Sequence, residues 1–138
     1  MIATLEWKQG TQYEGRSQSG HSILYDSDAQ HTTGPSPMEA VLTALCACTS
    51  MDIISILQKK REPVTSLVVS ADAQQASEPP RTFTQIRLVY RVGGNISKKA
   101  MEDAVSLSKN KYCSVSKMLE KSATIEFVIE YADGAPSE

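Results

Sequence analysis

The chain has 138 residues, of which 41% are hydrophobic and 22% charged, and its formal net charge is −2. This length predicts a single domain, residues 1–138, with a core that buries most of its apolar surface. The basic residues are scattered, so the sequence lacks the clustered basic face that nucleic acids and anionic membranes require. We therefore expect a soluble globular protein with neither nucleic acid nor membrane as a partner.

The first quarter of the chain is predicted to form strands. Apolar and polar residues alternate from Ala3 to Lys8, which is typical of a half-buried strand. Shorter strands are predicted around residues 12–15 and 22–25, with glycines at the turns, and a polar loop covers residues 27–35. Met1 leads directly into a strand, so no secretory signal is expected. The chain also has three cysteines, an odd number. An odd number of cysteines in a chain with no expected secretory signal favours a reducing cytoplasm over a disulfide framework.

A long apolar helix is predicted from about residue 37 to residue 60. Ser36 suits the N-cap, Pro37 the first helical position, and Glu39 completes a capping box. Only Thr43 is polar between Ala40 and Cys48, and a helix that is apolar on all sides is buried. A membrane span is disfavoured because a central aspartate costs about 2.5–3.5 kcal/mol. One sheet face cannot cover such a helix, so we expect a homodimer in which a partner subunit covers the rest.

The second half of the chain predicts more strands and two helices. Strands are expected at residues 64–73, 84–92 and 123–131, and helices at residues 98–110 and 114–121. Residues 133–138 are expected to be a loose tail. This element order predicts an α+β fold with antiparallel sheets.

The cysteines are the candidate reactive groups. Cys46 and Cys48 point about 200° apart on a helix, so they cannot share a metal ion. His21 and His31 lack zinc-ligand spacing to any cysteine, and no metal site is expected. Cys113 precedes a helix start, where backbone amides favour a thiolate. Two readings stay open, a reactive thiol pair or two inert core residues.

Two segments of the chain resemble a known family. Residues 37–54, which contain Cys48, and residues 111–115, around Cys113, resemble the two cysteine segments of the OsmC/Ohr family of osmotically induced and organic hydroperoxide resistance proteins. Residues 34–39 and 50–57 resemble its bacterial YhfA-like branch most. The resemblance covers nearly the whole chain and implies an intertwined homodimer, with antiparallel sheets wrapped around a long central helix and active sites between subunits.

The characterised members of that family are thiol peroxidases, and the resemblance implies roles for two residues here. Cys48 corresponds to the thiol that attacks an organic hydroperoxide, and Cys113 to the thiol that resolves the sulfenate as a disulfide. An external thiol would reduce that disulfide, with no other cofactor. The studied branches have a catalytic Glu where Met38 stands, so Glu39 and Arg16 are only the nearest candidates for their activating Glu/Arg pair. The alternative is a non-enzymatic dimer that binds a small apolar ligand at its interface and has structural cysteines.

Asp52 lies one helical turn after Cys48 and shares its face. Because a buried unpaired carboxylate is expensive, one hypothesis pairs Asp52 with an arginine or with backbone amides. The other places Asp52 in solvent at the rim of a cleft. The candidate arginines are Arg16, Arg81, Arg87 and Arg91.

Overall fold

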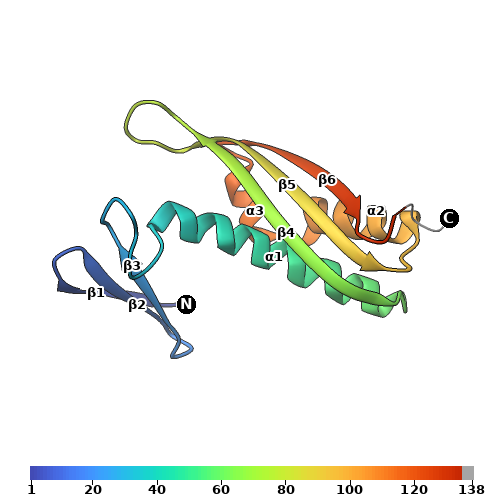
Figure 1. Cartoon of the computed structure of the whole chain (residues 1–138), viewed down its shortest axis with the longest axis horizontal. Helices are drawn as coiled ribbons and strands as arrows, with labels where there is room; N and C mark the ends of the chain where they lie inside the picture. Colours follow the sequence, from blue (N-terminus) through green and yellow to red (C-terminus); the bar gives the residue numbers. More distant parts are fainter. Residues whose placement is uncertain (135–138) are drawn as a thin grey trace. The chain divides into compact units, whose positions relative to one another are not determined.

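The computed structural model describes residues 1–134 and divides the chain into two compact units, Met1–Leu42 and a second that begins at Thr43. Helix α1 (Pro37–Lys59) begins in the first unit and continues through the second (Figure 1). The elements follow the expected order of strands, long helix, strands, helices and strand. The expectation of a single domain stays a prediction.

The first unit contains a three-stranded antiparallel sheet of β1 (Ala3–Gln9), β2 (Gln12–Ser17) and β3 (Ser22–Asp26), in the order β1-β2-β3. The expectation of a half-buried first strand is wrong for the single chain, because β1 is exposed along its whole length. Leu5 and Trp7 are 61% and 64% exposed. The alternating pattern correctly predicts the strand, but burial depends on which surface covers it.

The second unit contains the sheet β4-β5-β6, formed by β4 (Val64–Gln75), β5 (Phe83–Gly94) and β6 (Thr124–Tyr131). β4 and β5 pair antiparallel as predicted, but β5 and β6 pair in parallel. The expectation of purely antiparallel sheets is therefore wrong for β6. A parallel pair needs a long crossover, and here helical segments separate β5 from β6 along the chain.

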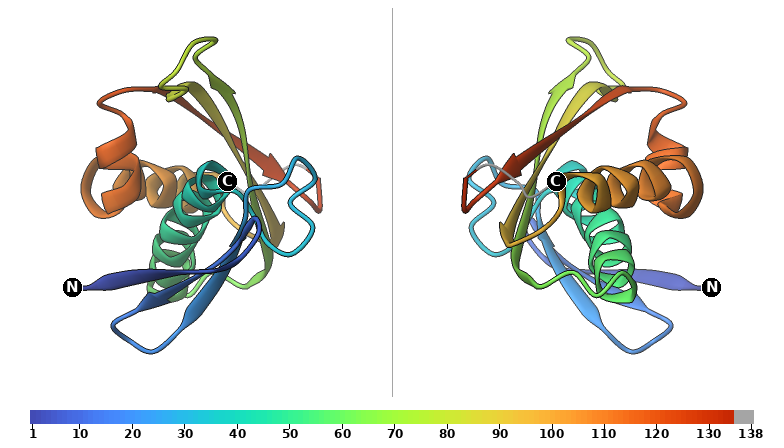
Figure 2. Two further views of the ribbon diagram at one scale, coloured as in Figure 1. Left: turned by 90° about the vertical axis from the view of Figure 1, so that its left-hand side faces the viewer. Right: turned by 90° about the vertical axis from the view of Figure 1, so that its right-hand side faces the viewer.

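The core of the second unit lies between this sheet and its helices, which cover one face (Figure 2). Side chains alternate along β5, and Ile86, Leu88, Tyr90 and Val92 are buried. Against this face α1 contributes a stripe with a spacing of four residues: Leu45, Thr49, Ile53 and Leu57. The remaining residues of α1 are half-buried or exposed in the single chain.

The crossover from β5 to β6 contains three helical segments. α2 (Lys98–Leu107) is amphipathic, and a π-helical turn, η1 (Ser108–Tyr112), follows it directly. α3 (Ser114–Leu119) is the short helix predicted after Cys113. The predicted helix over residues 98–110 thus changes to π geometry at Ser108.

The expected loose tail is ordered where it begins. Asp133 Oδ2 accepts a hydrogen bond from the Gly94 amide at 2.6 Å, and the Gly134 amide donates to Tyr131 O. Residues 135–138 of the predicted tail lie outside the described residues.

Candidate active site

Cys48 and Cys113 come together in the second unit, although 65 positions separate them in the sequence. Cys48 is half-buried on α1, and Cys113, 1% exposed, joins η1 to α3. The two thiols lie close enough for Cys48 to contribute, after burial, to raising the pKa of Cys113. The two residues that the family resemblance singles out are therefore neighbours in the fold.

Cys113 is the N-cap of α3, as its place in the sequence suggests. Its Sγ accepts a hydrogen bond from the Ser116 amide at 3.4 Å. As expected at a helix start, the Ser116 amide lowers the pKa of Cys113 and so favours the thiolate, but it is not the largest influence. Burial raises the pKa of Cys113, and this outweighs the lowering by Ser116. Cys113 is thus a protonated thiol at neutral pH.

Cys46 lies two residues before Cys48 on α1 and points to another side of the helix. It is half-buried, and burial raises its pKa. Within residues 1–134, no group of three or more His, Cys, Asp or Glu side chains is placed to hold a metal ion.

A chain of hydroxyl groups, which the sequence analysis missed, runs beside the cysteines. Tyr90 Oη lies 2.7 Å from Thr49 Oγ1, and Thr49 Oγ1 lies 2.8 Å from Ser108 Oγ. Ser108 Oγ donates to Asp52 Oδ2 at 2.8 Å. Tyr90, Thr49 and Ser108 are at most 1% exposed. The available signal was Thr49 itself, a polar residue on the otherwise apolar stripe of α1.

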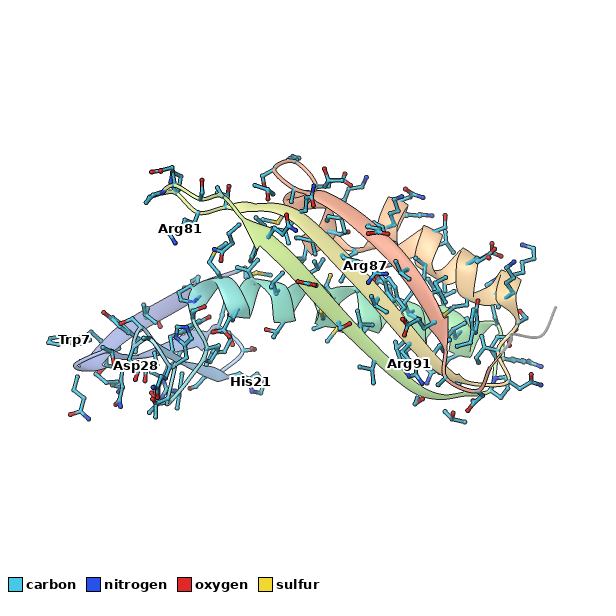
Figure 3. All side chains as sticks on the ribbon, turned by 45° about the horizontal axis from the view of Figure 1, so that its top comes forward. Trp7, His21, Asp28, Arg81, Arg87 and Arg91 are labelled. Atoms are coloured by element: carbon cyan, nitrogen blue, oxygen red, sulfur yellow. The ribbon has the colours of Figure 1, made fainter. Side chains whose placement is uncertain are left out.

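Asp52 accepts a hydrogen bond from the Ser108 hydroxyl, a partner that neither sequence hypothesis named. Its partial exposure agrees with the hypothesis that it lies at the rim of a cleft. Arg87 and Arg91 point away from the core on the outer face of the sheet (Figure 3), where they pair with Glu126 and Glu130 of β6. Asp52 is partly exposed and also lines a surface cavity of about 380 Å³ with Lys59, Lys60 and Tyr112 among others.

The two candidates for an activating pair belong to the first unit and have other partners. The Oε1 atom of Glu39 accepts a hydrogen bond from the Ser36 amide at 2.9 Å, and the Glu39 amide donates one to Ser36 Oγ at 3.2 Å. These two bonds form the predicted capping box. The Ser36 amide also lowers the pKa of Glu39. Arg16 is exposed on β2 and pairs with Glu14 at 3.1 Å. Glu39 also lies 3.6 Å from His31 Nε2, so each of these residues has its partners within the first unit.

Comparison with known proteins confirms the resemblance seen in the sequence. Residues 29–128 match the sequence model of a family described as OsmC-like protein. The chain belongs to the OsmC-like family. The matched range contains Cys48, Cys113 and the whole hydroxyl chain of the second unit.

One relative of this OsmC-like chain is Protein YhfA of Escherichia coli strain K12, which is 43% identical over 126 residues, covering 91% of this chain and 93% of YhfA. A hypothetical protein from Aquifex aeolicus VF5 has a crystal structure with a TM-score of 0.85 at 28% identity, covering 94% of each chain. The organic hydroperoxide resistance protein OhrB of Bacillus subtilis shares the fold, with a TM-score of 0.69 at 12% identity, covering 94% of this chain and 98% of OhrB.

Helix α1 is also long and apolar enough to cross a membrane, by length and composition. Its buried stripe packs against the sheet of its own unit, as a core helix does. OsmC-like proteins are soluble, which agrees with this interpretation.

Proposed function

We propose that this OsmC-like protein is a cytoplasmic thiol peroxidase that reduces organic hydroperoxides with Cys48 and Cys113. The observation that carries the proposal is that the fold brings the two thiols close together, one half-buried and the other buried. Membership of a family that includes organic hydroperoxide resistance proteins supports the choice of substrate.

In the first step the Cys48 thiolate attacks one peroxide oxygen. The O–O bond breaks, the alcohol leaves with a proton, and Cys48 becomes a sulfenic acid. In the second step the Cys113 sulfur attacks the Cys48 sulfur, so that the S–S bond forms and the S–O bond breaks. Hydroxide leaves with the Cys113 proton as water. An external thiol then reduces the disulfide by exchange.

The protonation of Cys113 suits this second role. A buried thiol with a raised pKa competes poorly for peroxide, so oxidation is directed to Cys48. The same thiol brings the proton that the leaving hydroxide needs. The surroundings of Cys48 on α1 are mainly apolar, which favours an organic over a small polar peroxide.

A single-turnover experiment tests the proposal. Reduced protein is mixed with one equivalent of cumene hydroperoxide, and free thiols are counted over minutes. The wild type is expected to lose two thiols, with Cys48 and Cys113 joined in one disulfide. A Cys46→Ser control should behave like the wild type, Cys48→Ser should not react, and Cys113→Ser should stop at the sulfenic acid. Persistence of all the wild-type thiols would reject the enzyme.

One observation favours the alternative, a protein that binds a small apolar ligand. The first unit contains a cavity of about 670 Å³ whose lining includes Leu5, Tyr13, Ile23 and Tyr25. A volume of this size suits a small molecule. Saturable binding of apolar ligands by a protein whose thiols ignore peroxide would establish this function instead.

We also propose that the protein is a homodimer. In the single chain Met51 on α1 is 71% exposed, and Ile23 and Leu24 on β3 are each 51% exposed. A second copy of the chain would cover such exposed apolar side chains in each unit. A solution mass equal to that of two chains at micromolar concentration is expected, whereas a stable monomer would contradict the proposal.

A further inference from the structure

The buried hydroxyl chain beside the cysteines has no part in the chemistry proposed above. It joins Tyr90 on β5, Thr49 and Asp52 on α1, and Ser108 at the start of η1 through three hydrogen bonds of 2.7–2.8 Å. It therefore links three elements at the point where α1 carries Cys48.

The hydrogen bonds of the hydroxyl chain all donate in one direction, from Tyr90 towards Asp52. The single hydroxyl proton of Ser108 goes to Asp52, so Ser108 Oγ accepts from Thr49. The Thr49 proton is then used, so Thr49 Oγ1 accepts from Tyr90. Burial raises the pKa of Tyr90 to about 12, which keeps its phenol protonated and able to donate at neutral pH. Each hydroxyl proton thus has a definite acceptor, and the chain ends on the Asp52 carboxylate.

Ser108 is also bonded to Cys113 through its main chain. The Cys113 amide donates to Ser108 O at 2.9 Å, which closes the π-helical turn η1. One residue is therefore fixed through its side chain to Thr49 and Asp52, and through its carbonyl to Cys113. Thr49 is the next residue after Cys48, and Asp52 is one turn further along. The connection from the Cys48 helix to Cys113 passes through Ser108.

We infer that Ser108 is a positioning residue that holds Cys113 in register with Cys48 through its hydrogen bonds to Thr49 and Asp52. Its role in turnover rests on the proposed peroxidase function, whose disulfide-forming step it would serve. A disulfide requires the two Cβ atoms to come within about 3.5–4.5 Å, so small shifts between α1 and η1 alter the ease of closure. Single-turn π segments frequently lie at functional sites, and η1 directly precedes Cys113.

The test measures the effective concentration of the two thiols toward each other, without peroxide. The protein is equilibrated in glutathione redox buffers, and the fraction with the Cys48–Cys113 disulfide is read by peptide mass analysis. In Ser108→Ala the effective concentration is expected to fall about tenfold or more, because a misplaced pair loses the advantage of proximity. The control Ser70→Ala, the same substitution at an exposed position of β4, should equal the wild type.

Thr49 supplies a second test if Ser108→Ala does not fold. Thr49→Val removes the hydroxyl and should also lower the effective concentration about tenfold, whereas Thr49→Ser keeps the hydroxyl and should restore it. Tyr90→Phe removes only the far end of the chain and should stay near the wild type, since Ser108 keeps both of its partners.

Three results would overturn the inference. The first is an unchanged effective concentration of the thiols in both Ser108→Ala and Thr49→Val. The second is an equal fall in effective concentration in Thr49→Ser and Thr49→Val. The third is a fall in Tyr90→Phe as large as that in Ser108→Ala. Failure of the proposed function looks different, because wild-type thiols would then ignore cumene hydroperoxide. The glutathione equilibrium reports on Ser108 in either case.

Discussion

Replacing Thr49 by valine removes a buried hydroxyl without removing volume, so the change isolates its hydrogen bonds. Tyr90 Oη, which is fully buried, would lose its acceptor. An unsatisfied buried donor costs about 1–3 kcal/mol. Ser108 Oγ would lose a donor but keep its bond to Asp52, which adds about 0.5–1.5 kcal/mol. The expected loss in the free energy of unfolding is therefore roughly 1.5–4.5 kcal/mol.

Urea unfolding of the reduced protein at one fixed concentration measures this loss. Fixed concentration matters because the stability of a dimer depends on it. Thr49→Ser is the matched control, and it should lose only about 1 kcal/mol for one buried methyl group. In the double variant Thr49→Val/Tyr90→Phe, the loss should be smaller than the sum of the single losses by about 0.5–3 kcal/mol, since no donor is left stranded. A Thr49→Val protein as stable as Thr49→Ser would refute the reasoning.

Three further outcomes are expected. Hydrogen bonds from the Asp28 amide, and then from the Thr11 and Thr33 hydroxyls, lower the pKa of Asp26 well below the ordinary 3.8. The carboxylate therefore stabilises the fold above pH 3.8, and this stabilisation is lost as the pH falls below 3.8. The urea midpoints of the wild type and Asp26→Asn should converge towards low pH, and a difference that stays constant with pH would contradict this. Burial raises the pKa of Cys113 above the ordinary cysteine value of 9.0, so the rate of disulfide closure should still increase as the pH rises past 9.0. A plateau near pH 7 in stopped-flow closure rates would contradict this. Ser36→Ala should cost about 0.5–2 kcal/mol in urea unfolding by breaking the capping box of α1, and an unchanged midpoint would contradict that role.

Local patterns in the sequence predict most elements of this fold. The alternation in residues 84–92 correctly places Ile86, Leu88 and Tyr90 on the buried face of β5. Ser36 and Glu39 correctly mark the start of α1 because a capping box involves only neighbouring residues. The parallel pairing of β6 was not predictable in this way, because it depends on the path of a long crossover.

The candidate site is predictable only in part, for a similar reason. Family resemblance singles out Cys48 and Cys113, and the structure brings them together. The raised pKa of Cys113 was missed because burial at a helix start cannot be read from the residues that flank it. Serine and threonine hydroxyls have many possible partners, so the bonds of Ser108 emerge only from the packing of α1 against η1.

The central claim is that Cys48 and Cys113 form a peroxide-reducing pair. Steady-state consumption of cumene hydroperoxide, with a dithiol as reductant, tests it most directly. The account predicts that wild-type protein and Cys46→Ser consume peroxide at the same catalysed rate, and that Cys48→Ser falls to the rate of the dithiol alone. Consumption by the wild type no faster than by Cys48→Ser would contradict it.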